Sequence, residues 1–339
     1  MEPVSCRSDN FIVNVIKCME EYGTVVITDI YDSEQSIELS EQIINSILTI
    51  CKLTKWTMDD LPPQTKPGLF HMLFANLHQV WEIRQNPLIV NIFKQLYTHF
   101  YGAPIDELII SGDGINIKPP TEPLHNNNNF KTSSEWAHID QTNLSLPNCI
   151  QGQVVLEDTT AAFVASTKSH HITRHLIQKY EKHSTDMIHG GQWWKFSKKE
   201  ITEIKELLSS IDGEYQVPII APKGSLILWF SNTIHAARLQ TEIPKTIPLD
   251  NPYFGWRVVV YVCYRPKHEW NPTDLKIRQQ AFENNLTTTH WGYSHYMQEK
   301  QKYHKNGHIR LLIQDPKKVY DIIGKPVLTD IGRSLLGYI

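Results

Sequence analysis

Apolar residues in the first hundred positions recur every three or four places, which is the period of an amphipathic helix. The pattern predicts a helix that begins near Phe11 and closes at Gly23, with Ser8 or Asp9 as its cap. A β-branched run at 24–29 predicts a strand. We therefore expect a mostly helical N-terminal region that buttresses a sheet. A second helix is predicted over 36–52. After the Pro-rich break at 61–63 more helix is expected, which is interrupted near Pro87 and resumes through Tyr97.

From about residue 107 the pattern changes to short apolar runs separated by turn residues, which is typical of strands. One helix interrupts this region, because Ser197 and Glu200 form a capping-box pattern ahead of apolar residues with helical spacing. No regular strand–helix alternation and no internal repeat is evident, so the pattern favours an α+β fold with a jelly-roll or barrel core. After Pro266 the tail is polar and then partly helical. The expected strands cover 108–110, 114–118, the segment around 138, 150–156, 161–165, 215–220, 225–230 and 257–264.

Composition narrows the class of protein only modestly. The 339 residues suffice for one large domain or two smaller ones, and 41% hydrophobic with 20% charged residues is typical of a globular protein. The formal net charge of -3 gives no overall attraction to nucleic acid or to an anionic membrane. The five scattered cysteines fit neither a disulfide framework nor a zinc ribbon. With no secretory signal and no apolar run of about 20 residues, we expect an intracellular, cytoplasmic protein without a membrane span.

The candidate chemistry starts at His138 and Asp140. In an extended strand, side chains two positions apart emerge on the same face, so this imidazole and this carboxylate are expected to point the same way. They make up two thirds of the 2-His-1-carboxylate triad that holds non-haem Fe(II) and leaves further coordination positions open. Alone the pattern is weak, because a solvated pair of strand residues has the same spacing.

Further motifs follow in a fixed order between residues 108 and 267, and the ordered set is more specific than any one of them. Together they resemble the phytanoyl-CoA dioxygenase family of Fe(II)/2-oxoglutarate oxygenases, with a looser likeness in the N-terminal helices. The motifs are Asn116-Ile-Lys-Pro-Pro120, Trp136-Ala-His-Ile-Asp140, Val155-Leu-Glu-Asp158, Ala161-Ala-Phe-Val-Ala-Ser-Thr-Lys-Ser-His170, Lys223-Gly-Ser-Leu-Ile-Leu-Trp-Phe230, Ile234-His235 and Gly255-Trp-Arg257.

The resemblance implies a double-stranded β-helix, which is a jelly-roll with the metal near its open end. It also implies that His138, Asp140 and His235 bind Fe(II). Arg257 matches the arginine that pairs with the distal carboxylate of the cosubstrate 2-oxoglutarate, a task that suits the planar fork of a guanidinium. Asn116 and Lys118 stand where some members contact the cosubstrate. The implied reaction couples oxidative decarboxylation of 2-oxoglutarate by O2 to substrate hydroxylation, with ascorbate as a supporting reductant.

The chain departs from the family pattern at two places. Ala237 replaces a hydroxyl residue that often helps to hold 2-oxoglutarate, and Thr167-Lys-Ser-His170 stands for the usual Pro-Gly-Ser-His. Both leave the metal ligands intact and affect the cosubstrate contacts.

Several residues have competing interpretations. His170 or His171 is a rival third ligand to His235, which then becomes a core histidine, and Arg238 is the rival carboxylate binder to Arg257. Lys118 is equally well explained as a solvated lysine. Trp193 and Trp194 lie in a lid-like insertion near 171–213, where they either close over the substrate or pack in the core.

We therefore expect a helical support at 1–107, a catalytic jelly-roll at 108–267 within the same domain, and a C-terminal extension at 268–339. The expected function is hydroxylation of a small molecule or acyl conjugate, with a protein or peptide hydroxylase and a non-catalytic binding jelly-roll as alternatives. Asp140 argues against halogenation, since halogenating relatives carry a small residue there. Cys263 stands where nucleic-acid dealkylases of the superfamily carry a second arginine, so no nucleic-acid substrate is expected.

Overall fold

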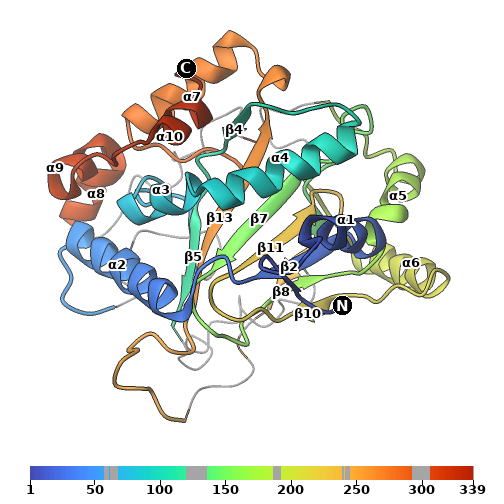
Figure 1. Ribbon diagram of the computed structural model, residues 1–339, viewed down its shortest axis with the longest axis horizontal. Helices are drawn as coiled ribbons and strands as arrows, with labels where there is room; N and C mark the ends of the chain where they lie inside the picture. Colours follow the sequence, from blue (N-terminus) through green and yellow to red (C-terminus); the bar gives the residue numbers. More distant parts are fainter. Residues whose placement is uncertain are drawn as a thin grey trace. The chain divides into compact units, whose positions relative to one another are not determined.

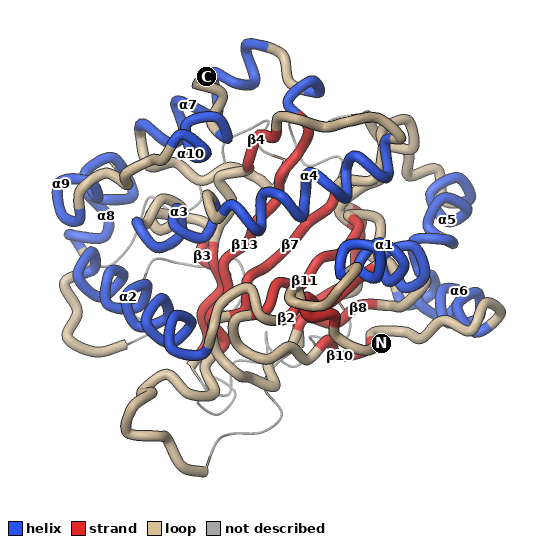
Figure 2. The backbone as a smooth tube through the Cα atoms, in the orientation of Figure 1, coloured by secondary structure: helices blue, strands red, loops and turns tan. Residues whose placement is uncertain are grey.

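The computed structural model describes residues 1–56, 61, 68–119, 136–185, 192–238, 240, 245–291 and 306–338. These residues form a mixed α+β fold (Figures 1 and 2). The chain divides into two compact units. The first unit comprises Met1–Ser33 and Pro119–Arg257, and the second comprises Glu34–Lys118 and Val258–Ile339. Each unit therefore combines two segments that are far apart in sequence. The domain limits expected at residues 107 and 267 stay predictions.

Two groups of strands make up most of the first unit. One follows the order β1-β2-β11-β7, in which β1 is parallel to β2 and β11 is antiparallel to both of its neighbours. The other follows the order β10-β8-β12-β6-β9, with every neighbouring pair antiparallel. The strands of this unit are β1 (Val4–Ser5), β2 (Thr24–Thr28), β6 (His138–Ile139), β7 (Ile150–Val155), β8 (Phe163–Ala165), β9 (Trp194–Lys195), β10 (Val217–Ile219), β11 (Ser225–Phe230) and β12 (His235–Ala237). The predicted strands β2, β6, β7, β8, β10 and β11 are confirmed, and β6 is only two residues long. Strands β1, β9 and β12 were not predicted.

Helix α1 (Phe11–Tyr22) packs beside β2 and β11 (Figure 1). Its predicted cap is wrong, because Asn10 occupies the N-cap with φ 59° and makes no side-chain cap bond. Its predicted end is confirmed: Gly23 has φ 76° and donates its N–H to the carbonyl of Met19 at 2.9 Å. A Cβ at Gly23 would lie 2.6 Å from Oγ1 of Thr233, so both the backbone conformation and the lack of space require glycine.

A hydrophobic core lies on one side of the β6–β9 pair. The core-facing residues of the two strands, Ile139 and Trp194, are opposite each other and buried. Three short helical elements cover this region, η4 (Ser169–His171), α5 (Thr173–Lys179) and α6 (Lys198–Ser209). The predicted capping box of α6 is confirmed, with reciprocal bonds between Ser197 and Glu200. The cluster contains Ala137, Ile139, Ile172, Leu176, Ile177, Trp194, Phe196, Ile204, Leu208 and Ile234.

The second unit is richer in helix. Its strand β13 is flanked by β4 and β5, and β3 pairs with β5. The break predicted at Pro87 is confirmed, since Pro87 begins α4 after the capping residue Asn86. No helix in the described residues is both long and apolar enough to cross a membrane. The elements are α2 (Ser33–Cys51), β3 (Leu69–Phe70), α3 (His78–Arg84), α4 (Pro87–Tyr101), β4 (Leu108–Ile110), β5 (Ile115–Lys118), β13 (Arg257–Pro266), η5 (Lys267–Glu269), α7 (Pro272–Glu283), α8 (Gly307–Gln314), η7 (Pro316–Lys318), α9 (Val319–Ile323) and α10 (Asp330–Leu335).

Candidate metal centre

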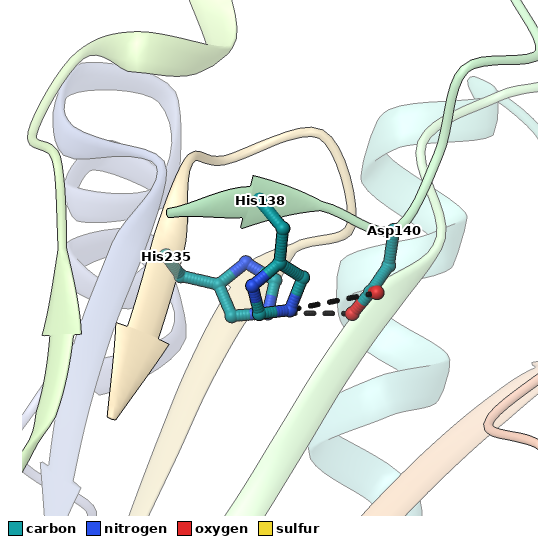
Figure 3. Close-up of side chains that lie close together, drawn as sticks. All are labelled: His138, Asp140 and His235. Atoms are coloured by element: carbon teal, nitrogen blue, oxygen red, sulfur yellow. Dashed lines mark ion pairs between the residues drawn. The ribbon is translucent and has the colours of Figure 1, made fainter. Parts of the chain in front are cut away.

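The first unit brings three potential metal ligands together (Figure 3). His138 lies on β6, His235 lies on the neighbouring strand β12, and the two residues are direct partners in the strand register. Asp140 follows the end of β6 and turns its carboxylate toward both rings. Nε2 of His138 is 3.7 Å from Oδ1 of Asp140, and Nε2 of His235 is 3.3 Å from Oδ2. One donor atom from each residue falls in a group within 4.8 Å, and all three residues are buried.

Backbone carbonyls set the orientation of both imidazoles. Nδ1 of His138 lies 3.1 Å from the carbonyl of Trp136, and Nδ1 of His235 lies 2.8 Å from the carbonyl of Thr233. A carbonyl only accepts hydrogen bonds, so in the neutral ring the proton sits on Nδ1 and the lone pair on Nε2. Both lone pairs therefore face the Asp140 carboxylate, and this tautomer is the one that binds a metal through Nε2.

The support of His235 extends to the end of α1. Oγ1 of Thr233 donates to the carbonyl of Gly23 at 2.8 Å, while the carbonyl of Thr233 receives the His235 hydrogen bond. The ring of His235 also packs against Phe163 and Trp229, with ring centroids 5.5 and 5.6 Å away. These contacts hold the imidazole in place, and a ligand that is already held loses less entropy when it binds an ion.

Gln151 on β7 fixes the carboxylate. Its Nε2 donates to Oδ2 of Asp140 at 3.0 Å and to Oγ of Ser231 at 2.8 Å. The backbone carbonyl of Ser231 in turn accepts the N–H of Asp140 at 2.8 Å. Gln151 and Ser231 are buried, so this network holds Asp140 in place beyond the end of its strand.

We expect Gln151→Leu to weaken Fe(II) binding by about 10- to 100-fold, because it removes the donor that orients Asp140. Calorimetric titration under anaerobic conditions measures the effect. Gln153→Leu is a matched control, since Gln153 lies two positions along the same strand and contacts Arg257 instead. Equal metal affinity in wild type and Gln151→Leu contradicts the assigned role.

Arg257 is buried at the start of β13. It donates from Nη1 to the carbonyl of Ala161 at 2.7 Å and from Nη2 to Oε1 of Gln153 at 3.0 Å. Because Oε1 must accept from the guanidinium, the amide Nε2 of Gln153 points elsewhere, and this buried donor meets no hydrogen-bond partner in the described residues. An arginine and an amide donor together are suited to a carboxylate.

Strand β7 contacts both Arg257 and the candidate metal ligand Asp140. Gln151 and Gln153 are two positions apart on one face of β7, which separates them by about 7 Å. One contacts Asp140 and the other contacts Arg257. This spacing is comparable to the length of a five-carbon dicarboxylate.

The other residues predicted for the site have different surroundings. Asn116, which is buried, and Lys118, which is partly buried, lie on β5 in the second unit, where both pack against Gly68. Their contact with the cosubstrate stays a prediction. Arg238 is partly buried just after β12 and donates from Nε to the carbonyl of Thr160 at 3.1 Å.

His170 and His171 are not part of the group of three ligands. Nε2 of His170 lies 3.0 Å from the carbonyl of Glu20, and its ring stacks on His171 with centroids 3.9 Å apart. Burial and the neighbouring His171 lower the pKa of His170 to about 4. His170 is thus a neutral packing residue at the turn after β8.

This pKa makes the free energy of unfolding depend on pH. The unfolded chain takes up a proton on His170 near pH 6.5, whereas the folded chain does so only near its lowered pKa. The contribution of neutral His170 to the free energy of unfolding is fully present above about pH 6.5. It decreases by about 1–3 kcal/mol as the pH falls toward 4. Chemical denaturation at pH 7 and 5 is expected to show a smaller loss for His170→Gln than for wild type. An unchanged loss in His170→Gln, or an equal reduction in the control His175→Gln at an exposed histidine, contradicts this assignment.

Comparisons with known proteins identify structures of the same fold, but they do not identify a family for this chain. No family model matches the chain. It is 23% identical to Ava biosynthesis cluster protein O of Aspergillus versicolor over 242 residues, covering 69% of this chain and 70% of that protein. A crystal structure from Salmonella typhimurium LT2 matches 97% of this chain and 82% of its own, with TM-score 0.58 and 14% identity. The chain therefore shares the fold of that protein.

A more distant likeness is to the non-heme alpha ketoglutarate dependent carbocyclase SnoK from nogalamycin biosynthesis. It covers 78% of this chain and 87% of SnoK, with TM-score 0.44 and 13% identity. This similarity is too low to extend to the fold or to the function.

Proposed function

We propose that this chain is an Fe(II)/2-oxoglutarate-dependent oxygenase that hydroxylates a small molecule or acyl conjugate. The observation that carries the proposal is the convergence of His138, Asp140 and His235, whose donor atoms lie within 4.8 Å of one another. Two imidazoles and one carboxylate are the donor set that favours non-haem Fe(II) with open coordination positions. The orientation of both Nε2 lone pairs toward Asp140 fits a bound cation.

Arg257 supports the choice of cosubstrate. We assign the distal carboxylate of 2-oxoglutarate to its guanidinium and to the unsatisfied amide donor of Gln153. Gln151, two positions away on this face of β7, and Asp140, which it contacts, would then be the residues nearest to the opposite end of the cosubstrate. Asn116 and Lys118 are further candidate contacts. When bound, Fe(II) and 2-oxoglutarate supply the oxidising chemistry, with O2 as oxidant and succinate and CO2 as products.

The chain's own residues orient the ligands and limit access of water. His138 and His235 are buried, and the aromatic rings of Phe163 and Trp229 lie beside His235. Such surroundings protect a reactive centre from solvent. The relative from Aspergillus versicolor is named for a biosynthesis cluster, which agrees with a small-molecule substrate. We further propose that the strands of the first unit form the jelly-roll core.

The test is formation of succinate by the purified protein with Fe(II), 2-oxoglutarate, O2 and ascorbate. Asp140→Asn is the control, because it keeps the size of the side chain and removes the charge that holds the cation. Acyl-CoA, lipid, amino-acid and peptide pools are then screened for stimulation. Stimulation by peptides alone transfers the proposal to a protein hydroxylase. Absence of both metal binding and succinate formation overturns it in favour of a non-catalytic binding protein.

A further inference from the structure

Strand β9 and the residues around it alternate sharply between exposed and buried side chains. Trp193 is 44% exposed, whereas Trp194 is 6% exposed and packs in the hydrophobic core with Tyr180 and Phe196. Lys195 is exposed again. Successive strand residues point to opposite faces, so Trp193 and Lys195 share the outer face. The sequence did not distinguish the two tryptophans, and only Trp193 is available to a ligand. Residues 187–191 of the same insertion lie outside the described residues.

The strand register places this outer face beside the metal ligands. His138 is directly opposite Lys195, and Ile139 is directly opposite Trp194. Directly opposed residues of antiparallel strands emerge on the same face. The side chain of Lys195 therefore leaves the sheet on the same face as the His138 imidazole, while Ile139 and Trp194 both enter the core.

Ring contacts agree with this register. The centroid of Trp136 is 4.3 Å from that of His138, with an interplanar angle of 35°. The centroid of Trp193 is 6.0 Å from that of His138 and 6.4 Å from that of Trp136. Two indoles thus adjoin one candidate metal ligand, and one of them, Trp193, is partly open to solvent. We call Trp136 and Trp193 the indole pair.

The exposed indole and the ammonium group on this surface favour a flat, anionic ligand. An exposed indole offers a large flat apolar area, and stacking of an aromatic ring adds about 0.5–1.5 kcal/mol to the burial itself. The ammonium of Lys195 repels a cation and attracts an anion. The side chain of Lys195 is exposed, and none of the ion pairs found among the described residues involves it.

We propose that the substrate is a small planar aromatic acid, whose ring lies against the indole pair and whose anionic group pairs with Lys195. The inference rests on the proposed oxygenase function, because it makes this surface the substrate subsite next to His138. A flat ring held there lies adjacent to the metal ligands, which is the position a reacting group requires.

Equilibrium binding to the metal-free protein tests this recognition without any turnover. The probes are 2-naphthoate, its neutral amide 2-naphthamide, and the saturated decahydro-2-naphthoate, titrated by calorimetry. We expect 2-naphthoate to bind at least about tenfold more tightly than either analogue, which corresponds to about 1.4 kcal/mol. Trp193→Leu is expected to remove the advantage over the saturated acid. Lys195→Met is expected to remove the advantage over the amide.

Lys199→Met is the matched control, because Lys199 is an exposed lysine on α6 of the same unit. It is expected to leave all three affinities unchanged. Equal binding of the three probes to wild type overturns the inference, and so does unaltered selectivity in Trp193→Leu and Lys195→Met. Binding of Fe(II) and of 2-oxoglutarate is measured separately. If these fail while selective naphthoate binding persists, the oxygenase proposal falls and the aromatic-acid site stands.

Discussion

His235→Gln is expected to lower the affinity for Fe(II) by at least about 100-fold while the protein remains folded. Changes to residues that only orient a ligand typically cost 10- to 100-fold, so removing a ligand nitrogen costs more. Glutamine keeps a polar side chain of similar size in the space beside Phe163 and Trp229. Anaerobic titration with Fe(II), or with Co(II) followed by its absorption, gives the affinity. Thermal melting followed by circular dichroism reports the fold.

The control for this experiment is His171→Gln, at the exposed member of the rival histidine pair. It is expected to bind Fe(II) like wild type. Gln151 donates to Oδ2 of Asp140 at 3.0 Å, closer than the 3.3 Å from Nε2 of His235, so the carboxylate is expected to keep its orientation when the imidazole is lost. Normal affinity in His235→Gln together with a loss in His171→Gln would show that the third ligand has been misassigned.

Most secondary structure was predictable because the signals are local. The β-branched run of β2, the Gly23 end of α1, the capping box of α6 and the Pro87 start of α4 all appear where residue chemistry requires them. The N-cap residue of α1 was not predictable, because Asn10 adopts a left-handed conformation and makes no side-chain cap bond. The division into two units depends on tertiary packing of segments distant in sequence, which a linear pattern does not report.

The candidate ligands were predictable as a motif, but the atoms that hold them were not. His138 and Asp140 do point together, although Asp140 lies beyond the strand and is held by Ser231 and Gln151. One signal for this network was present in the sequence. Strand β7 is buried throughout, yet it carries two glutamines on the same face, and buried polar residues at such spacing need partners. Which partners they meet depends on the register of strands from other parts of the chain.

Replacing Arg257 is the sharpest test of the cosubstrate site. Arg257→Gln is expected to weaken 2-oxoglutarate binding by about 10- to 1000-fold, which corresponds to about 1.4–4 kcal/mol for a lost charge-assisted pair. The glutamine side chain retains a donor toward the carbonyl of Ala161, which limits damage to the strand. Arg257→Lys is expected to fall between wild type and Arg257→Gln, because an ammonium keeps the charge and loses the planar fork.

Two further variants make the result specific. Gln153→Leu is expected to weaken 2-oxoglutarate binding by about tenfold, since it removes both the amide donor and the acceptor that orients the guanidinium. Arg238→Ala, which replaces the rival arginine, is expected to leave the affinity for 2-oxoglutarate unchanged. Calorimetry with metal-loaded protein gives the affinity for 2-oxoglutarate, and a separate metal titration is expected to be the same in all variants. If Arg238→Ala weakens 2-oxoglutarate binding and Arg257→Gln does not, the carboxylate belongs beside Arg238. The five-carbon diacid then no longer follows the glutamine face of β7, and the site must be rebuilt from the end of β12.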